Sequence, residues 1–239
     1  MRDIPTDDDS AIMTQAVIFD LDGTLVDSVP DLVGALNSVL KAAGRRGVTL
    51  HEGSQMVGGG AETLIDQAFA LTGTPTEGVE LADHLENFLD HYRARPARDT
   101  TIFDGVVPVL EGLAARGFKL GICTNKPHAM AMTVLEELSL DHYFAACIGQ
   151  GALPFHKPDR RHYDGVANAL GVAPENTIYI GDSETDVATA RNAGVPIVLV
   201  SFGYSQRPAA ELGGDRLIDH FSELPNTLDE LFSMPRTAP

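Results

Sequence analysis

Short apolar runs of strand length alternate with amphipathic helical patterns from about residue 101 to near the end of the chain. This alternation predicts a parallel sheet with helices on both faces, because parallel strands are joined by crossovers that are usually helices. We expect strands at Phe118–Cys123, Ala146–Ile148, Thr177–Ile180, Pro196–Val200 and Leu217–Ile218, and helices at Val106–Arg116, Ala129–Leu138, Arg161–Leu170, Val187–Asn192 and Leu224–Phe232. The predicted fold class is therefore α/β.

A helical segment interrupts this pattern after its first strand. Ala16–Phe19 is a short β-branched and aromatic run, typical of a buried strand. Residues 30–100 instead show apolar stripes at helical spacing and no convincing strand. We therefore predict a Rossmann-like parallel-sheet core built from residues 15–29 and 101–239, with an all-helical domain of residues 30–100 inserted in it. Residues 1–14, rich in aspartate, are predicted to form an acidic tail in solvent.

Charge and composition exclude several classes of partner. The 34 Asp and Glu outnumber the 17 Lys and Arg, for a formal net charge of -17, and no basic run could follow a nucleic-acid backbone. No apolar run approaches the ~20 residues of a membrane-spanning helix. Cys123 and Cys147 are too few for a zinc site or a disulfide framework. We expect a cytoplasmic protein, monomeric or homodimeric, that binds neither nucleic acid nor membrane.

Polar side chains follow the predicted strands directly. Asp20 and Asp22 come after the first strand, and Thr124 and Asp182 each come at or just after the end of a later one. Open parallel sheets bind their ligands in the crevice beyond the carboxyl ends of the strands. Carboxylates gathered there repel one another unless a cation lies between them, and hard oxygen ligands suit Mg²⁺. The sequence therefore predicts a magnesium site formed by Asp20, Asp22 and Asp182.

Lys157 is placed to reach the same crevice. Pro158 biases the preceding residue toward an extended conformation, which leaves the lysine in a loop between Thr124 and Asp182. An ammonium there would neutralise a phosphate and a carboxylate together. A single loop lysine is usually solvated and a single strand-end threonine is commonplace, so the prediction depends on the residues as a set.

The set resembles a known family. Asp20–Ser28 is similar to the first motif of the haloacid dehalogenase-like phosphatases, Thr124 to the second, Lys157 to the third and Gly181–Asp186 to the fourth, in family order. The helical insert after the first motif resembles the cap domain of that superfamily, so the resemblance covers nearly the whole chain. Within the superfamily, residues 27–32, 57–60 and 124–127 are most similar to the phosphoglycolate phosphatases.

The resemblance implies a catalytic role for each motif residue. Asp20 would be the nucleophile that accepts the phosphoryl group as an aspartyl-phosphate, and Asp22 would be the general acid and base. Thr124, Asn125 and Lys157 would bind the phosphoryl oxygens and stabilise the charge that develops on them. The reaction implied is hydrolysis of a phosphate monoester.

The resemblance also implies a Mg²⁺ ion and a substrate loop. The metal ligands would be the side chains of Asp20 and Asp182 and the backbone carbonyl of Asp22, with Asp186 behind them or reached through a water. In the cap, the loop facing the substrate would be formed by Gly58, Gly59 and Gly60. The chain departs from many relatives in having Arg160 where they have a second proline, which leaves the path of the Lys157 loop open.

The substrate most strongly implied is 2-phosphoglycolate, a small phosphate monoester with a carboxylate. A sugar-phosphate mutase of the β-phosphoglucomutase type shares the paired aspartates and is an alternative, as is a phosphatase for another small phosphate or pyrophosphate. A non-catalytic module is disfavoured because the whole set is present. The groups that could bind the substrate carboxylate, left unranked by sequence, are the backbone amides of residues 58–61, Lys41, Arg93 and Arg95.

Overall fold

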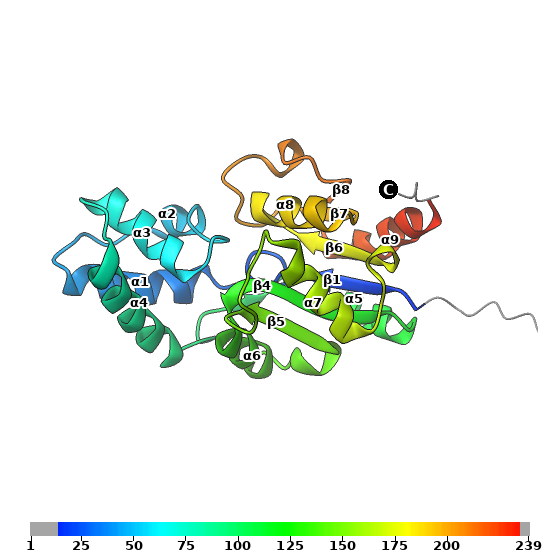
Figure 1. Cartoon of the computed structure of the whole chain (residues 1–239), viewed down its shortest axis with the longest axis horizontal. Helices are drawn as coiled ribbons and strands as arrows, with labels where there is room; N and C mark the ends of the chain where they lie inside the picture. The colour runs from blue at the N-terminus through cyan, green and yellow to red at the C-terminus, as the bar shows by residue number, and fades with distance from the viewer. Residues whose placement is uncertain (1–13, 235–239) are drawn as a thin grey trace, which may run out of the picture.

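A six-stranded parallel sheet forms the centre of the computed structural model, which describes residues 14–234 (Figure 1). Its strand order is β5–β4–β1–β6–β7–β8. The strands are β1 (Ala16–Phe19), β4 (Lys119–Pro127), β5 (Ala146–Gln150), β6 (Thr177–Gly181), β7 (Ile197–Val200) and β8 (Arg216–Ile218). The order reverses at β1, which pairs with β4 on one side and β6 on the other. The carboxyl ends of these three strands therefore adjoin at the point where such sheets bind ligands.

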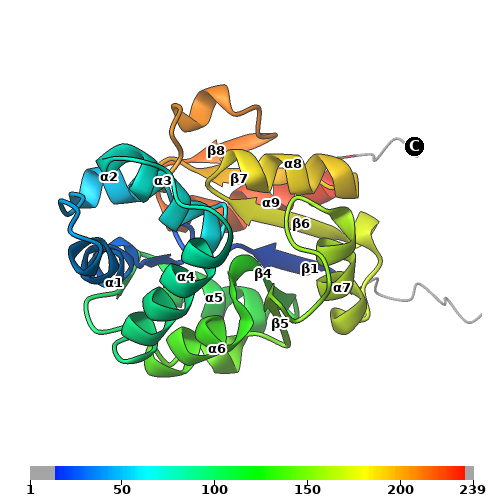
Figure 2. The same cartoon turned by 60° about the vertical axis from the view of Figure 1, so that its left-hand side comes forward.

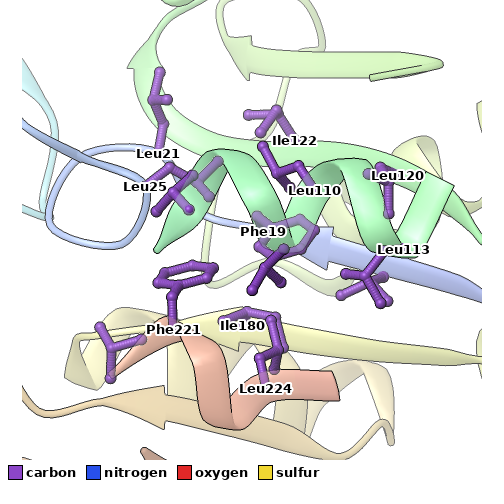
Figure 3. Close-up of a cluster of buried hydrophobic side chains, with 14 of the residues drawn as sticks. Phe19, Leu21, Leu25, Leu110, Leu113, Leu120, Ile122, Ile180, Phe221 and Leu224 are labelled. Carbon is purple, nitrogen blue, oxygen red and sulfur yellow. The ribbon is translucent and has the colours of Figure 1, made fainter. Parts of the chain in front are cut away.

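Helices cover both faces of the sheet. They are α5 (Val106–Ala115), α6 (His128–Glu137) and α9 (Leu224–Ser233) on one face, and α7 (Arg160–Leu170) and α8 (Glu184–Ala193) on the other. Successive residues of β1 alternate between the two apolar layers, because side chains of a strand point to opposite faces. Val17 and Phe19 pack in the first layer, drawn in Figure 3, and Ala16 and Ile18 pack in the second. Burial on both faces explains why β1 is apolar throughout.

A helical unit lies beside the sheet, to its left in Figure 1 and nearer the viewer in Figure 2. Its helices are α1 (Val29–Ala42), α2 (Leu50–Ser54), α3 (Ala61–Thr72) and α4 (Gly78–Arg93). Helices α1, α3 and α4 share an apolar cluster of their own, which Met130 of α6 and Tyr204 join from the sheet side. The antiparallel pair β2 (Val26–Asp27) and β3 (Thr101–Ile102) connects the unit to the sheet. Helices and sheet thus meet at the carboxyl edge.

The predicted α/β class with a parallel-sheet core and a helical insert is confirmed. The limits of the insert as a separate domain stay a prediction, and the predicted acidic tail lies, apart from Thr14, outside the described residues. Within residues 14–234, no helix is long and apolar enough to cross a bilayer.

Three details differ from the sequence-based expectation. The strand expected to end at Cys123 continues to Pro127, with an irregularity in its pairing to β5 between these residues. The short strands β2 and β3 were not expected, because two residues are too few to show a period. Helix α2 was also missed, although Thr49 and Glu52 form a capping box whose spacing is visible in the sequence.

Candidate active site

The loop after β1 holds the first two carboxylates in a tight turn. The backbone N–H of Asp20 donates to the carbonyl of Ile180 at 2.9 Å, which fixes the residue to the neighbouring strand β6. Gly23 has φ +86°, and a Cβ there would come 2.4 Å from Oδ2 of Asp182. Only glycine therefore allows the loop of Asp20 and Asp22 to approach the loop after β6 this closely.

Lys157 reaches the end of β1 as predicted from sequence. Its Nζ lies 2.9 Å from Oδ1 of Asp20 and donates to Oδ1 of Asp186 at 2.7 Å and to the hydroxyl of Tyr179 at 3.0 Å. The lysine is 2% exposed. Arg160, the departure from the family pattern, begins α7 on the surface and pairs with Asp164 at 3.0 Å, so it does not draw the lysine away.

Hydrogen bonds from Asn125 hold the loop that carries Lys157. Its side-chain oxygen accepts from the backbone N–H of Lys157 at 2.9 Å, and its amide nitrogen donates to the carbonyls of Lys157 at 3.1 Å and of Gly58 at 3.2 Å. The side chain therefore joins the lysine loop to the helical unit. Its predicted contact with phosphate stays a prediction, as does that of Thr124, which is 2% exposed at the same edge.

A cluster of three buried carboxylates lies at the ends of β1 and β6. One oxygen each of Asp20, Asp182 and Asp186 lies within 4.8 Å of the others. Asp182 accepts from the hydroxyl of Thr24 and from the backbone N–H of Tyr204, both at 2.8 Å. The side chain of Asp22 is outside this cluster; the sequence analysis assigned it a metal contact through its backbone carbonyl.

Asp186 is more completely hydrogen-bonded than the other two carboxylates. Its Oδ1 accepts from Lys157 and Tyr179, and its Oδ2 accepts from the backbone N–H groups of Asp182 and Ser183 and from the hydroxyl of Ser183. Burial would raise its pKa, but Lys157 and these hydrogen bonds lower it. Asp186 is thus suited to orient Lys157 and the loop of Asp182, in keeping with its expected place behind the metal ligands.

The charges of the cluster are not balanced. Burial raises the pKa of Asp20 to about 6 against the opposing charge of Lys157, and burial together with the neighbouring carboxylates raises the pKa of Asp182 well above its ordinary value. Oδ1 of Asp20 is buried without a hydrogen bond of good geometry. Buried anions with unused oxygen lone pairs are the donor set of a hard divalent cation, so the residues present fit Mg²⁺.

A second buried lysine, Lys126, lies on the other side of this edge. Its Nζ donates to Oδ1 and Oδ2 of Asp22 at 2.9 and 3.1 Å and to the hydroxyl of Tyr92 in α4 at 2.6 Å. Burial alone would lower the pKa of the ammonium, but Asp22 and Tyr92 raise it above its ordinary value. The hydroxyl of Ser28 donates to Oδ1 of Asp22 at 2.6 Å. Asp22 is thus held between the sheet and the helical unit.

The sequence analysis gave Lys126 and Tyr92 no functional role. Tyr92 belongs to the apolar cluster of the helical unit, and it also lines the cavity and hydrogen-bonds Lys126. The signal for Lys126 was its spacing from Thr124, since residues two apart in a strand share a face. It was missed because the strand was expected to end before Thr124.

A cavity of about 40 Å³ lies between the sheet edge and the helical unit. The wall on the sheet side is mostly polar, and the wall on the helical side is mainly apolar. The residues that line it are Asp20, Asp22, Thr124, Asn125, Lys126, Pro127 and Met130 on the sheet side, and Leu32, Val57, Gly58, Gly60, Ala61, Leu64, Phe88 and Tyr92 on the helical side. A ligand bound in this cavity therefore contacts both the sheet edge and the helical unit.

The glycine loop lies partly at the cavity, whereas the side chains suggested to bind the substrate carboxylate do not lie there. Gly58 and Gly60 line the cavity, whereas Gly59 is packed against Thr63 and is not among the lining residues. Lys41, Arg93 and Arg95 are not among them either. Arg93, for example, pairs with exposed Asp90 on the outside of α4 at 2.8 Å. The structure therefore brings no side chain from this trio to the site.

The sequence has relatives of known family. The pattern of the family described as "Haloacid dehalogenase-like hydrolase" matches residues 17–200. The chain is 42% identical over 209 residues to the phosphoglycolate phosphatase of Caulobacter vibrioides, covering 87% of this chain and 88% of the relative. It is 40% identical over 218 residues to the phosphoglycolate phosphatase of Agrobacterium fabrum, covering 91% and 94%. Both matches are long enough to include the sheet and the helical unit.

Solved structures share the same architecture. A crystal structure described as a predicted phosphoglycolate phosphatase from Haemophilus somnus matches with a TM-score of 0.83 and 28% sequence identity, covering 90% of this chain and 98% of that chain. A predicted phosphatase from Clostridium acetobutylicum matches with a TM-score of 0.80 and 24% identity, covering 92% and 100%. The second match shows the fold alone.

Proposed function

The chain belongs to the haloacid dehalogenase-like hydrolase family, and we propose that it hydrolyses 2-phosphoglycolate to glycolate and phosphate through an aspartyl-phosphate on Asp20. It is a phosphoric monoester hydrolase that acts on a small phosphate substrate. The observation that carries the finer proposal is the convergence of Asp20, Lys157 and Asp182 at the ends of β1 and β6, beside a cavity that Asp22 also lines.

The first half-reaction transfers the phosphoryl group to the enzyme. A carboxylate oxygen of Asp20 attacks phosphorus, the bond from phosphorus to the ester oxygen breaks, and Asp22 donates a proton to the departing alkoxide. Lys157, held against Asp20 and Asp186, places its positive charge where the phosphoryl oxygens gather charge. Thr124 donates its hydroxyl to one of these oxygens.

The second half-reaction releases phosphate. Asp22, now deprotonated, takes a proton from water; the water oxygen bonds to phosphorus as the bond to Asp20 breaks. Lys126 and Ser28 hold the Asp22 carboxylate in place for both proton transfers. A Mg²⁺ ion bound by Asp20, Asp182 and the backbone carbonyl of Asp22 would offset the charge of the phosphoryl oxygens.

The cavity supports a small leaving group with few hydroxyls. The wall formed by the helical unit is largely aliphatic and aromatic, with Leu32, Val57, Leu64 and Phe88 among its residues. The hydroxyl groups of a hexose would find few partners there, and burying them unpaired is costly. This favours a phosphoglycolate-sized ester over the substrates of a sugar-phosphate mutase.

A panel of small phosphate esters tests the proposal. We expect kcat/KM for 2-phosphoglycolate to exceed that for glycerol phosphates and hexose phosphates by about two orders of magnitude, the discrimination that unpaired polar contacts produce. A higher kcat/KM for β-glucose 1-phosphate or pyrophosphate than for 2-phosphoglycolate would overturn the substrate assignment. Interconversion of hexose phosphates without release of phosphate would identify a mutase instead.

A further inference from the structure

The wall of the cavity carries a single cationic side chain within residues 14–234, and it belongs to Lys126. The lysine is 5% exposed, although the chain as a whole has a formal net charge of -17. Such a charge repels an anionic substrate, so a substrate with an anion beyond its phosphate needs a local positive charge to bind. Lys157 does not line the cavity, and its ammonium is paired with two carboxylates, Asp20 and Asp186, whereas Lys126 is paired, among the described residues, with Asp22 alone.

The position of Lys126 relative to Asp22 identifies the part of the substrate that it faces. In the proposed reaction Asp22 protonates the ester oxygen, and the ammonium of Lys126 lies one hydrogen bond from that carboxylate, at 2.9 Å. In a 2-phosphocarboxylate the carboxyl carbon is two bonds from the ester oxygen. The substrate carboxylate can therefore reach the ammonium when the ester oxygen meets Asp22.

We propose that Lys126 is the residue that selects the substrate, by binding the carboxylate of a leaving group that carries it next to the ester carbon. This assignment rests on the proposed function of the site and names a contact that the function does not specify. An ammonium has three N–H donors, which Lys126 spends on both oxygens of Asp22 and on Tyr92. It can keep its bonds to Oδ1 of Asp22 and to Tyr92 and turn the third donor, from the longer contact with Oδ2 of Asp22, to the substrate.

Tyr92 adds to the same recognition. Its hydroxyl accepts from Lys126 at 2.6 Å and can donate its own proton to the carboxylate. Since Tyr92 lies in α4 of the helical unit and Lys126 in β4 of the sheet, one substrate anion bridges the two. The surrounding aliphatic residues exclude water, which strengthens the ion pair and penalises a leaving group that leaves the ammonium unmatched.

The competing interpretation is that Lys126 only orients Asp22. A comparison of two substrates separates the interpretations: 2-phosphoglycolate, and ethyl phosphate, whose leaving group has a methyl in place of the carboxylate. Any disturbance of Asp22 slows both reactions and cancels in the ratio of their kcat/KM values. Loss of a carboxylate contact lowers that ratio.

We expect Lys126→Met to lower the ratio of kcat/KM for 2-phosphoglycolate to that for ethyl phosphate by about 100-fold. Lys126→Arg, which keeps the charge, restores part of it. Lys41→Met is the matched control, because this exposed lysine near the end of α1 does not line the cavity. A change of less than tenfold in Lys126→Met, with circular dichroism showing a folded protein, overturns the proposal.

Tyr92→Phe covers the case in which Lys126→Met does not fold. The variant keeps the ring that packs against Phe88 and removes only the hydroxyl. We expect it to lower the same ratio by about threefold to tenfold, the effect of one hydrogen bond to a charged group. An unchanged ratio in Tyr92→Phe overturns the proposal in that case.

Failure of the proposed function has a different outcome. In that case the wild-type enzyme hydrolyses 2-phosphoglycolate no faster than ethyl phosphate, before any substitution is made. If the wild-type enzyme prefers 2-phosphoglycolate and Lys126→Met keeps that preference, the proposed function stands and the proposed role of Lys126 is wrong.

Discussion

Two lysines of the described chain are buried, and their surroundings differ. Lys157 contacts Asp20, Asp186 and Tyr179, all of which belong to the sheet core. Lys126 contacts Asp22 from the core and Tyr92 from the helical unit. The first environment suits the phosphoryl group, which every phosphate ester shares. The second suits the leaving group, which differs between esters.

The two environments also differ in charge. Asp20, Asp182 and Asp186 face one ammonium at Lys157, whereas Asp22 and Lys126 form a balanced pair. The imbalance at the first is consistent with a site for a divalent cation, and the balance at the second leaves a donor for a substrate anion. Burial of a lysine therefore does not define its role; the charge of its partners and the part of the fold that supplies them do.

Removing the Lys157 ammonium gives the largest expected effect. Lys157→Met leaves Asp20 and Asp186 without their cation, and we expect kcat/KM to fall by about a thousandfold for both 2-phosphoglycolate and ethyl phosphate. Steady-state assays of both esters measure this, with Lys119→Met, on the same sheet but outside the cavity lining, as the control. If Lys157→Met strongly changed the ratio of kcat/KM for 2-phosphoglycolate to that for ethyl phosphate, Lys157 would also act on the leaving group, and the two lysines would not differ in role.

Removing divalent metal is expected to lower the rate of phosphate release by at least about 100-fold. Mg²⁺ should restore it and Ca²⁺ should not, because Ca²⁺ takes more ligands at longer distances and would draw a second oxygen of Asp20 away from phosphorus. Phosphate release in EDTA, followed by addition of each metal, measures the effect. Full activity in the chelator would contradict the assignment of Asp182.

The dependence of stability on pH is the smallest expected effect. The pKa of Asp20 is raised to about 6 and that of Asp182 is also raised, so the metal-free folded state binds protons on these groups more tightly than the unfolded state does. Their contribution to the free energy of unfolding is therefore present at low pH and is lost as the pH rises through 6. The lowered pKa of Asp186 acts only below its ordinary value of 3.8, outside this range. Mg²⁺ should therefore raise the Tm more at pH 8 than at pH 5, by on the order of 5 °C.

Thermal unfolding with and without Mg²⁺ measures this difference. Burial lowers the pKa of His162, which changes stability in the opposite direction, but this histidine is the same in both samples and cancels. Asp182→Asn is the control, since it removes one raised carboxyl and should reduce the dependence on pH. A stabilisation by Mg²⁺ that is larger at pH 5 would contradict the charge imbalance at the first lysine.

The sequence was sufficient to predict the parallel sheet and the positions of Asp20, Thr124 and Asp182 at its edge, because strand ends can be located from apolar runs and their polar successors share one edge. Lys157 was placed at the same edge by its loop before Pro158 and by the family resemblance. It was not sufficient for Lys126. That residue lies where β4 continues past its apolar part, and the continuation depends on pairing with Gln150, far along the chain.

The contact between Tyr92 and Lys126 was beyond prediction for a related reason. Tyr92 belongs to an apolar stripe of the helical unit, and helical periodicity locates its face without locating the hydroxyl at the end of the ring. The packing of α4 against the sheet edge decides that position. The same applies to Lys41, Arg93 and Arg95, whose charge made them candidates although none of them lines the cavity.

The proposed aspartyl-phosphate on Asp20 can be detected by the mass of the peptide that contains this residue during turnover of 2-phosphoglycolate. Samples are quenched in acid within the first turnovers, digested and analysed by mass spectrometry, with Asp20→Asn as the control. We expect this peptide to gain the mass of one phosphoryl group during turnover. The added mass should disappear when the substrate is exhausted and should be absent from Asp20→Asn. An unmodified peptide during steady release of phosphate, or full activity in Asp20→Asn, would contradict it.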